Sequence, residues 1–282
     1  MLIKRINSDN KTIANIYYYL DCDYQIKNNS KFVSFLIRDI KKTKYGYAGF
    51  KNKNLLKKHL HSSIFGSAKN IKIYDPKFKE KEVIKIIEKS IKKAHKIIKT
   101  RPTEINIFPT FHPFKIKKLS GVSGFCQKEG VIMLDINPAK GWQKALEKTL
   151  YHEFAHSIIK KPVKEWTLMD SIIYEGLADN FSEYISQKGP PIWNTKVSLK
   201  ECRKYFPKIK KMINSKTWRV YDAVFLGKGK YPMWLGYSMG YKIVHSFLKK
   251  NPKLKWKKIL NLKPKEIFKE YFLNKKSRDR SP

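Results

Sequence analysis

His152 and His156 lie four positions apart in the segment His-Glu-Phe-Ala-His, and Glu153 directly follows the first histidine. On a helix, residues four apart lie on the same face, so both imidazoles can bind one metal ion at about 2.0–2.1 Å. Glu153 would then lie near the ion without binding it. Such a motif arises by chance in about one chain in a hundred of this length and composition, so the surrounding sequence has to support it.

A third ligand is needed, because a catalytic zinc keeps three protein ligands and leaves a fourth position for water. Glu175 is our candidate, since eighteen residues separate it from His156 and allow one helix to end near Pro162 and a second to return. Asp179, one turn beyond Glu175, is placed to accept a hydrogen bond from the far nitrogen of His152. Taken alone, these carboxylates are more typical of a solvated helix face; the HExxH segment favours the ligand interpretation.

This ligand set predicts hydrolysis of a peptide bond by a water molecule that zinc activates, with Glu153 as the base that takes its proton and passes it to the departing amine. Two imidazoles and one carboxylate favour Zn²⁺ over manganese or cobalt. The oxyanion of the reaction needs a hydrogen-bond donor. Tyr237, Tyr241 and His245 are spaced by four on a predicted helix and share a face. We take Tyr237 as the first choice, although such a stripe is more often helix packing.

Apolar residues at helical spacing predict the elements that position these side chains. The HExxH segment lies in a helix predicted from Gly141 to Lys161, which Pro162 ends, and Glu175 lies in a second helix from about 167 to 187. Further helices are predicted over 76–101, 197–213, 236–250 and 264–273.

Strands are predicted over 71–74, 104–108 and 131–136, and the segment GVSGF at 121–125 is predicted to be a turn beside a strand. If the strand with Val131, Met133 and Asp135 is an exposed edge, its backbone can pair with an extended substrate peptide. An interior strand buried on both faces is an equally good interpretation of the same residues.

Several segments together resemble a known family. GVSGF at 121, VIMLDINP, YHEFAH, YEGLADNF and WLGYSMGYKIV at 234–244 resemble the bacterial predicted zinc-dependent proteases catalogued as domain of unknown function 2268, and HEFAH followed by EGLAD is similar to the gluzincin pattern. The resemblance covers about residues 100–250. It implies an α+β, zincin-like fold, in which a small mixed sheet packs on the active-site helix and a mainly helical part follows.

The domain organisation is less marked in the sequence than the motif. We predict a small helical region over 1–70, the zincin-like domain over 71–273 and a disordered basic tail over 274–282. No run of about 18 apolar residues and no signal-peptide core is present, so we expect no membrane segment and a cytoplasmic location. The sequence gives no indication of oligomeric state.

Net charge is the outlying feature of the composition. The 61 Lys and Arg residues against 23 Asp and Glu give a formal charge of +38, which attracts polyanions at low salt. A basic nucleic-acid-associated protein, with or without protease activity, is therefore the alternative to a peptidase. The basic residues are dispersed and no nucleic-acid reading module is recognisable, which favours a compositional origin. A purely structural zinc site is disfavoured, because the three cysteines lie far from the HExxH segment.

Overall fold

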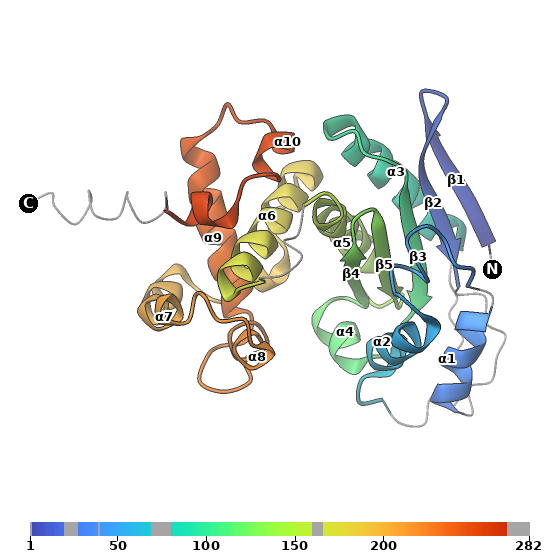
Figure 1. The fold of residues 1–282 in the computed structure, drawn as a ribbon, viewed down its shortest axis with the longest axis horizontal. Helices are drawn as coiled ribbons and strands as arrows, with labels where there is room; N and C mark the ends of the chain where they lie inside the picture. Colours follow the sequence, from blue (N-terminus) through green and yellow to red (C-terminus); the bar gives the residue numbers. More distant parts are fainter. Residues whose placement is uncertain (1, 20–27, 39, 69–79, 160–165, 270–282) are drawn as a thin grey trace, which may run out of the picture. The chain divides into compact units, whose positions relative to one another are not determined.

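The computed structural model describes residues 2–19, 28–38, 40–68, 80–159 and 166–269 (Figure 1). The chain forms two compact units, Met1–Ile158 and Ile159–Pro282. The sequence instead predicted boundaries near residues 70 and 273. The predicted strand over 71–74 and the tail over 274–282 lie outside the described residues.

The first unit is built on a five-stranded mixed sheet in the order β1-β2-β3-β5-β4. The three inner strands run parallel, whereas β1 and β4 pair antiparallel with their neighbours and form the two edges. The strands predicted over 104–108 and 131–136 are confirmed as β3 and β5. The strands are β1 (Leu2–Ser8), β2 (Lys11–Tyr18), β3 (Thr103–Pro109), β4 (Val122–Lys128) and β5 (Val131–Ile136).

The prediction of a helical region over residues 1–70 is wrong for its first part. β1 and β2 form a hairpin in which Ser8 pairs with Lys11, and the two turn residues Asp9 and Asn10 both have positive φ. Asp and Asn tolerate this conformation, which matches the twist of a two-residue hairpin turn. The hairpin joins the main sheet through the parallel pairing of β2 with β3.

Two further predictions concern the edge of the sheet and need correction. The segment 121–125 is not only a turn, because Val122 begins the edge strand β4. The strand with Val131, Met133 and Asp135 is not an edge: β5 pairs with β3 on one side and β4 on the other, and all three side chains are buried. Its backbone hydrogen bonds are therefore taken up inside the sheet. The interior-strand interpretation of β5 is the correct one.

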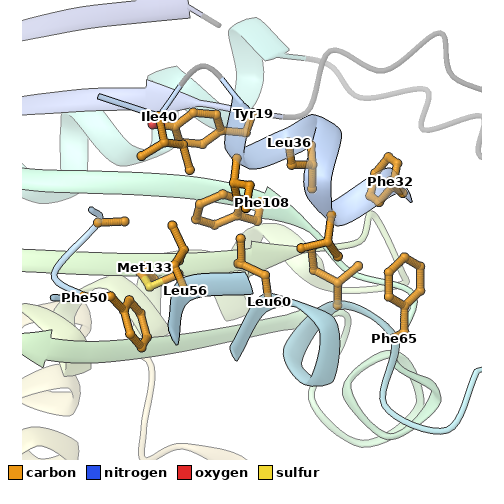
Figure 2. Close-up of a cluster of buried hydrophobic side chains, with 14 residues drawn as sticks. Tyr19, Phe32, Leu36, Ile40, Phe50, Leu56, Leu60, Phe65, Phe108 and Met133 are labelled. Atoms are coloured by element: carbon orange, nitrogen blue, oxygen red, sulfur yellow. The ribbon is translucent and has the colours of Figure 1, made fainter. Parts of the chain in front are cut away.

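Helices cover both faces of this sheet. α3 (Glu80–Ile97) packs on β2 and α5, and α5 (Trp142–His156) packs on β4 and β5. The opposite face carries α1 (Asn29–Arg38) and α2 (Lys53–Phe65), and the short α4 (Pro113–Lys118) packs by β4 (Figure 1). Figure 2 shows the aromatic-rich core under α1 and α2, where Phe108 and Met133 of the sheet meet Leu56 and Leu60 of α2.

The second unit is helical, and two of its helices approach closely through glycines. A Cβ added at Gly176 of α6 would overlap the carbonyl of Gly240 on α9, and one added at Gly240 would overlap the carbonyl of Ile172. Only glycine lets two helix backbones come this near.

No described helix is both long and apolar enough to cross a membrane. The unit contains α6 (Leu168–Ser186), the 3₁₀ turn η1 (Ile192–Thr195), α7 (Leu199–Lys211), α8 (Trp218–Leu226), α9 (Leu235–Lys250) and α10 (Trp256–Ile259).

The predicted helices over 141–161 and 167–187 correspond to α5 and α6, but α5 ends earlier than predicted. Ser157 caps it, and its hydroxyl donates to the carbonyl oxygen of Phe154 at 2.7 Å. α6 begins with a reciprocal cap between Thr167 and Asp170, in which each side chain accepts from the backbone N–H of the other residue. Helix α8 was not predicted, because its apolar residues occupy too short a segment for a clear helical period.

Candidate metal centre

The two histidines of the motif lie on one face of α5, as their spacing predicted. Their Nε2 atoms are 3.0 Å apart, and the ring planes meet at 75°. Both rings are buried, with 6% and 7% of the residue surface exposed for His152 and His156. A buried imidazole pair with converging nitrogens is suited to a shared ion, because two nitrogens each about 2.0–2.1 Å from a metal can adopt this separation.

Glu153 is held against the edge strand β4. Only 5% of its surface is exposed, and a Cβ added at Gly124 would overlap the side-chain carbons of Glu153. Gly124 pairs with Leu134 of β5, so its missing side chain faces α5. The glycine thus leaves the space that the carboxylate occupies beside the strand, where any larger residue would displace it.

Glu175 lies on α6, next to the glycine contact between α6 and α9. Its neighbour Gly176 meets the backbone of Gly240, so this contact fixes the turn of α6 that carries the carboxylate. The ligand atoms of His152, His156 and Glu175 all lie within 4.8 Å of one another. Among the residues that the structure describes, these three side chains are the group able to hold a metal ion.

Asp179, one turn after Glu175, is completely buried. Its Oδ2 accepts a hydrogen bond of 3.0 Å from Nε1 of Trp193, which lies in η1. The sequence predicted a partner for Asp179 on α5 and did not anticipate the indole. A tryptophan two residues after a Pro-Pro pair gives no sequence signal for such a contact, because loop geometry decides it.

Tyr237 of α9 lies in the electrostatic environment of the same two carboxylates. Burial raises its pKa well above the usual range, and the neighbouring Tyr221, Glu175 and Asp179 add to this rise. Its ring also packs edge-on against Phe225 at a centroid distance of 4.9 Å. The phenol is therefore held in its neutral form, which can donate a hydrogen bond.

The other two candidates on this face of α9 contact α6 further along the helix. The Tyr241 hydroxyl donates to Oε2 of Glu183 at 2.5 Å, and Nδ1 of His245 is 3.3 Å from Oδ1 of Asn180. Burial raises the pKa of Tyr241, and the hydrogen bond to Glu183 adds to the rise. These contacts tie α9 to α6, which is the packing role that the spacing also allowed.

An α+β protein with a histidine pair and a glutamate grouped on two helices has the donor set of a metal-dependent hydrolase. The family model described as "Predicted Zn-dependent protease (DUF2268)" matches residues 83–269, more than half of the chain, and the chain belongs to this family. Neither a curated protein nor a solved structure matches the chain. The family description therefore supports zinc and proteolysis in general, and the match does not cover residues 1–82 or 270–282.

Proposed function

We infer that the protein is a zinc-dependent peptidase of the gluzincin type with a zincin-like fold, in which His152, His156 and Glu175 hold the metal. The grouping of these three donors carries the inference, because the ligand atoms lie within 4.8 Å of one another. The family description supports the same activity. The mixed sheet packed on the helix of the histidine pair is the arrangement expected from the resemblance.

The donor set fits zinc. Two buried imidazoles and one carboxylate suit this ion, and three protein ligands leave a position open to the reaction. A closed structural site would add a fourth protein ligand, and the group has three members among the described residues. When bound, zinc lowers the pKa of a coordinated water toward about 7 and polarises a carbonyl oxygen.

Glu153 is the proposed base. Its place one residue after His152 and beside β4 supports this role, in which one carboxylate oxygen takes a proton from the water as the water oxygen bonds to the carbonyl carbon. The same oxygen then delivers that proton to the nitrogen of the departing amine, and the carbon–nitrogen bond breaks. Glu153 is a carboxylate again once it has given up the proton. No covalent intermediate with a serine or cysteine is required.

Tyr237 is the proposed donor to the oxyanion, and Asp179 the proposed acceptor for a ligating histidine. The raised pKa of Tyr237 supports its role, because a phenol that stays protonated donates a hydrogen bond throughout the neutral range. Asp179 already accepts from Trp193 through Oδ2. A carboxylate has two oxygens and several lone pairs, so this bond leaves capacity for an imidazole N–H.

The substrate is proposed to bind as an extended peptide along β4 rather than β5. β4 forms the edge of the sheet and lies directly against Glu153, so a peptide that pairs with it passes the proposed base. Met133 and Asp135 of β5 lie behind β4, where they pair with Phe125 and Ser123. They would therefore not contact the substrate directly, and would affect it only by supporting β4.

Metal removal and replacement tests the proposal. The purified protein should contain about one zinc per chain by elemental analysis, lose peptide hydrolysis on dialysis against a chelator, and regain it when zinc is added. Glu175→Ala should lower zinc affinity by more than tenfold, whereas Glu129→Ala, at an exposed carboxylate outside the group, should not. A protein that neither carries nor takes up zinc would refute the proposal.

Binding to nucleic acid is a separate prediction that rests on the net charge of +38. Titration of a labelled duplex at low and moderate salt tests it, because contacts with phosphates weaken steeply as salt rises. No measurable affinity at low salt would exclude this alternative.

A further inference from the structure

An exposed aromatic side chain stands on the edge strand β4, directly beside the glycine that faces Glu153. Phe125 is 37% exposed. It pairs with Met133 of β5, so it points to the face of the sheet that α2 covers, opposite to α5. Its surface therefore belongs to the free edge of β4 and not to the core.

Two rings from the N-terminal part of the chain pack against Phe125. The imidazole of His59 on α2 stacks on it at a centroid distance of 4.6 Å and an interplanar angle of 24°. Phe50 lies 5.1 Å from His59 and 6.3 Å from Phe125, centroid to centroid. Figure 2 shows Phe50 at the margin of the aromatic core, near Met133. The three rings form one aromatic cluster, which we call the edge cluster; Phe125 is its exposed member, and Phe50 is buried beneath it.

A partly buried polar contact one helical turn beyond His59 ties α2 to the sheet. The Ser63 hydroxyl donates to Asp135, and Nζ of Lys115 donates to both Ser63 Oγ and Asp135 Oδ2 at 2.6 Å. Thr110 also donates to the carbonyl of Ile64 at 3.2 Å. These bonds join α2, α4 and β5, so the edge cluster is preorganised.

A peptide paired with β4 would present alternate side chains to the two faces of the sheet. The side chain next to Gly124 points toward Glu153, and the adjacent one, next to Phe125, points toward α2. Directly opposed side chains on neighbouring strands lie about 4.5–5.5 Å apart, within contact distance of the Phe125 ring. The residue that meets the edge cluster thus lies one position from the residue beside the base.

We propose that Phe125 and His59 form a specificity site that selects an aromatic or large aliphatic side chain of the substrate one residue from the position facing Gly124. This proposal rests on the peptidase function inferred above and names its substrate class. Phe50 and His59 lie outside residues 83–269, so the site adds a selecting surface to the part of the chain that the family model matches.

The chemistry of the site favours an apolar side chain. Burial lowers the pKa of His59, Lys115 lowers it further, and Asp135 opposes both. The ring is therefore neutral at neutral pH and stacks as an uncharged aromatic. Offset or edge-to-face ring pairs contribute about 0.5–1.5 kcal/mol beyond the burial of their surface. A cationic side chain would be repelled by the nearby Lys115 and by a chain whose formal net charge is +38.

The test uses short host peptides in which one guest residue, Phe, Leu, Ala or Lys, is walked through each position. Two readouts are taken on the zinc-loaded full chain: kcat/KM for cleavage, and peptide affinity of the Glu153→Gln variant by fluorescence anisotropy. At one guest position, Phe and Leu should exceed Ala and Lys by about three- to tenfold in both readouts. Phe125→Ala should abolish this discrimination, and His59→Ala should reduce it.

Ile97→Ala is the matched control, because Ile97 on α3 is 36% exposed and lies away from β4. It should keep the full discrimination. Phe125→Leu retains an apolar side chain and should keep the preference for Leu while losing part of that for Phe. If Phe125→Ala discriminates as wild type does, or if no guest position shows discrimination, the specificity site is refuted. If the wild-type protein cleaves none of the peptides while the affinity readout still discriminates among the guest residues, the peptidase function is refuted instead.

Discussion

The two faces of the mixed sheet differ in the side chains and helices that cover them. The face under α5 includes Leu134 and Ile132, and Gly124 leaves space there for the carboxylate of Glu153, the proposed base. The face under α1 and α2 packs on a core of mixed aliphatic and aromatic residues, and the ion pair of Lys115 with Asp135 joins it to α4. The α5 face lies in the segment that the family model matches, whereas α1 and α2 precede it. We infer that the reaction belongs to one face and the selection of substrate to the other.

This comparison predicts its largest effect at Glu153. Glu153→Gln keeps the shape of the side chain but removes the proposed base, so kcat/KM should fall by about 10²–10⁴-fold. Zinc content should remain that of wild type, because the residue is not among the grouped ligands. The measurement is steady-state peptide hydrolysis with elemental analysis of the same preparations.

Glu147→Gln is the control for this change. Glu147 lies on the same helix and accepts a hydrogen bond from the Tyr151 hydroxyl, so the variant alters a carboxylate of α5 outside the motif. It should hydrolyse peptides at close to the wild-type rate. Equal losses in the two variants would mean that the effect of Glu153→Gln is structural.

The elements that form these two faces differ in how well the sequence predicts them, because only some have a long hydrophobic pattern. The helix of the HExxH motif and the interior strands β3 and β5 were predictable, because long helical periods and branched apolar runs are strong local signals. Ser123 and Gly124 are poor strand formers, so the sequence of β4 predicts a turn where the structure has a strand. β4 is a strand because it pairs with β5 and packs against Glu153 of α5. Both contacts are with residues distant in the sequence.

The N-terminal hairpin has a local turn signal in the sequence. Asp9 and Asn10 stand between two runs that each contain branched residues, which is typical of a two-residue hairpin turn. The edge cluster could not have been predicted, because Phe50, His59 and Phe125 are far apart in the chain and only the packing of α2 brings them together. Long-range packing of this kind leaves no periodicity in the sequence.

The ion pair between Lys115 and Asp135 predicts that breaking it lowers the stability of the protein without removing zinc. In Lys115→Met the buried carboxylate of Asp135 loses its cation, and breaking such a pair costs about 3 kcal/mol or more. The free energy of unfolding, measured by urea denaturation, should fall by that amount. Zinc content should not change, because the pair lies on the opposite face from α5.

A double variant separates the ion pair from the general packing of this region. Lys115→Met combined with Asp135→Leu removes both charges, so it should recover part of the stability that the single variant loses. If Lys115→Met is as stable as wild type, the pair does not fasten α2 and the proposed division between the two faces loses its structural basis.

The close approach of β4 to α5 predicts a smaller effect, on activity more than on stability. In Gly124→Ala the new methyl group overlaps the side chain of Glu153, so the carboxylate has to move. A displacement of about 1 Å in a catalytic group costs about 10²-fold in rate. We expect kcat to fall by that order while zinc stays bound.

Combining Gly124→Ala with Glu153→Ala should give the same thermal midpoint as the Glu153→Ala single variant, because the new methyl group then has no long side chain to overlap. Additive losses of stability in that cycle would show that Gly124 is required by the strand itself, and the contact with the base would be incidental.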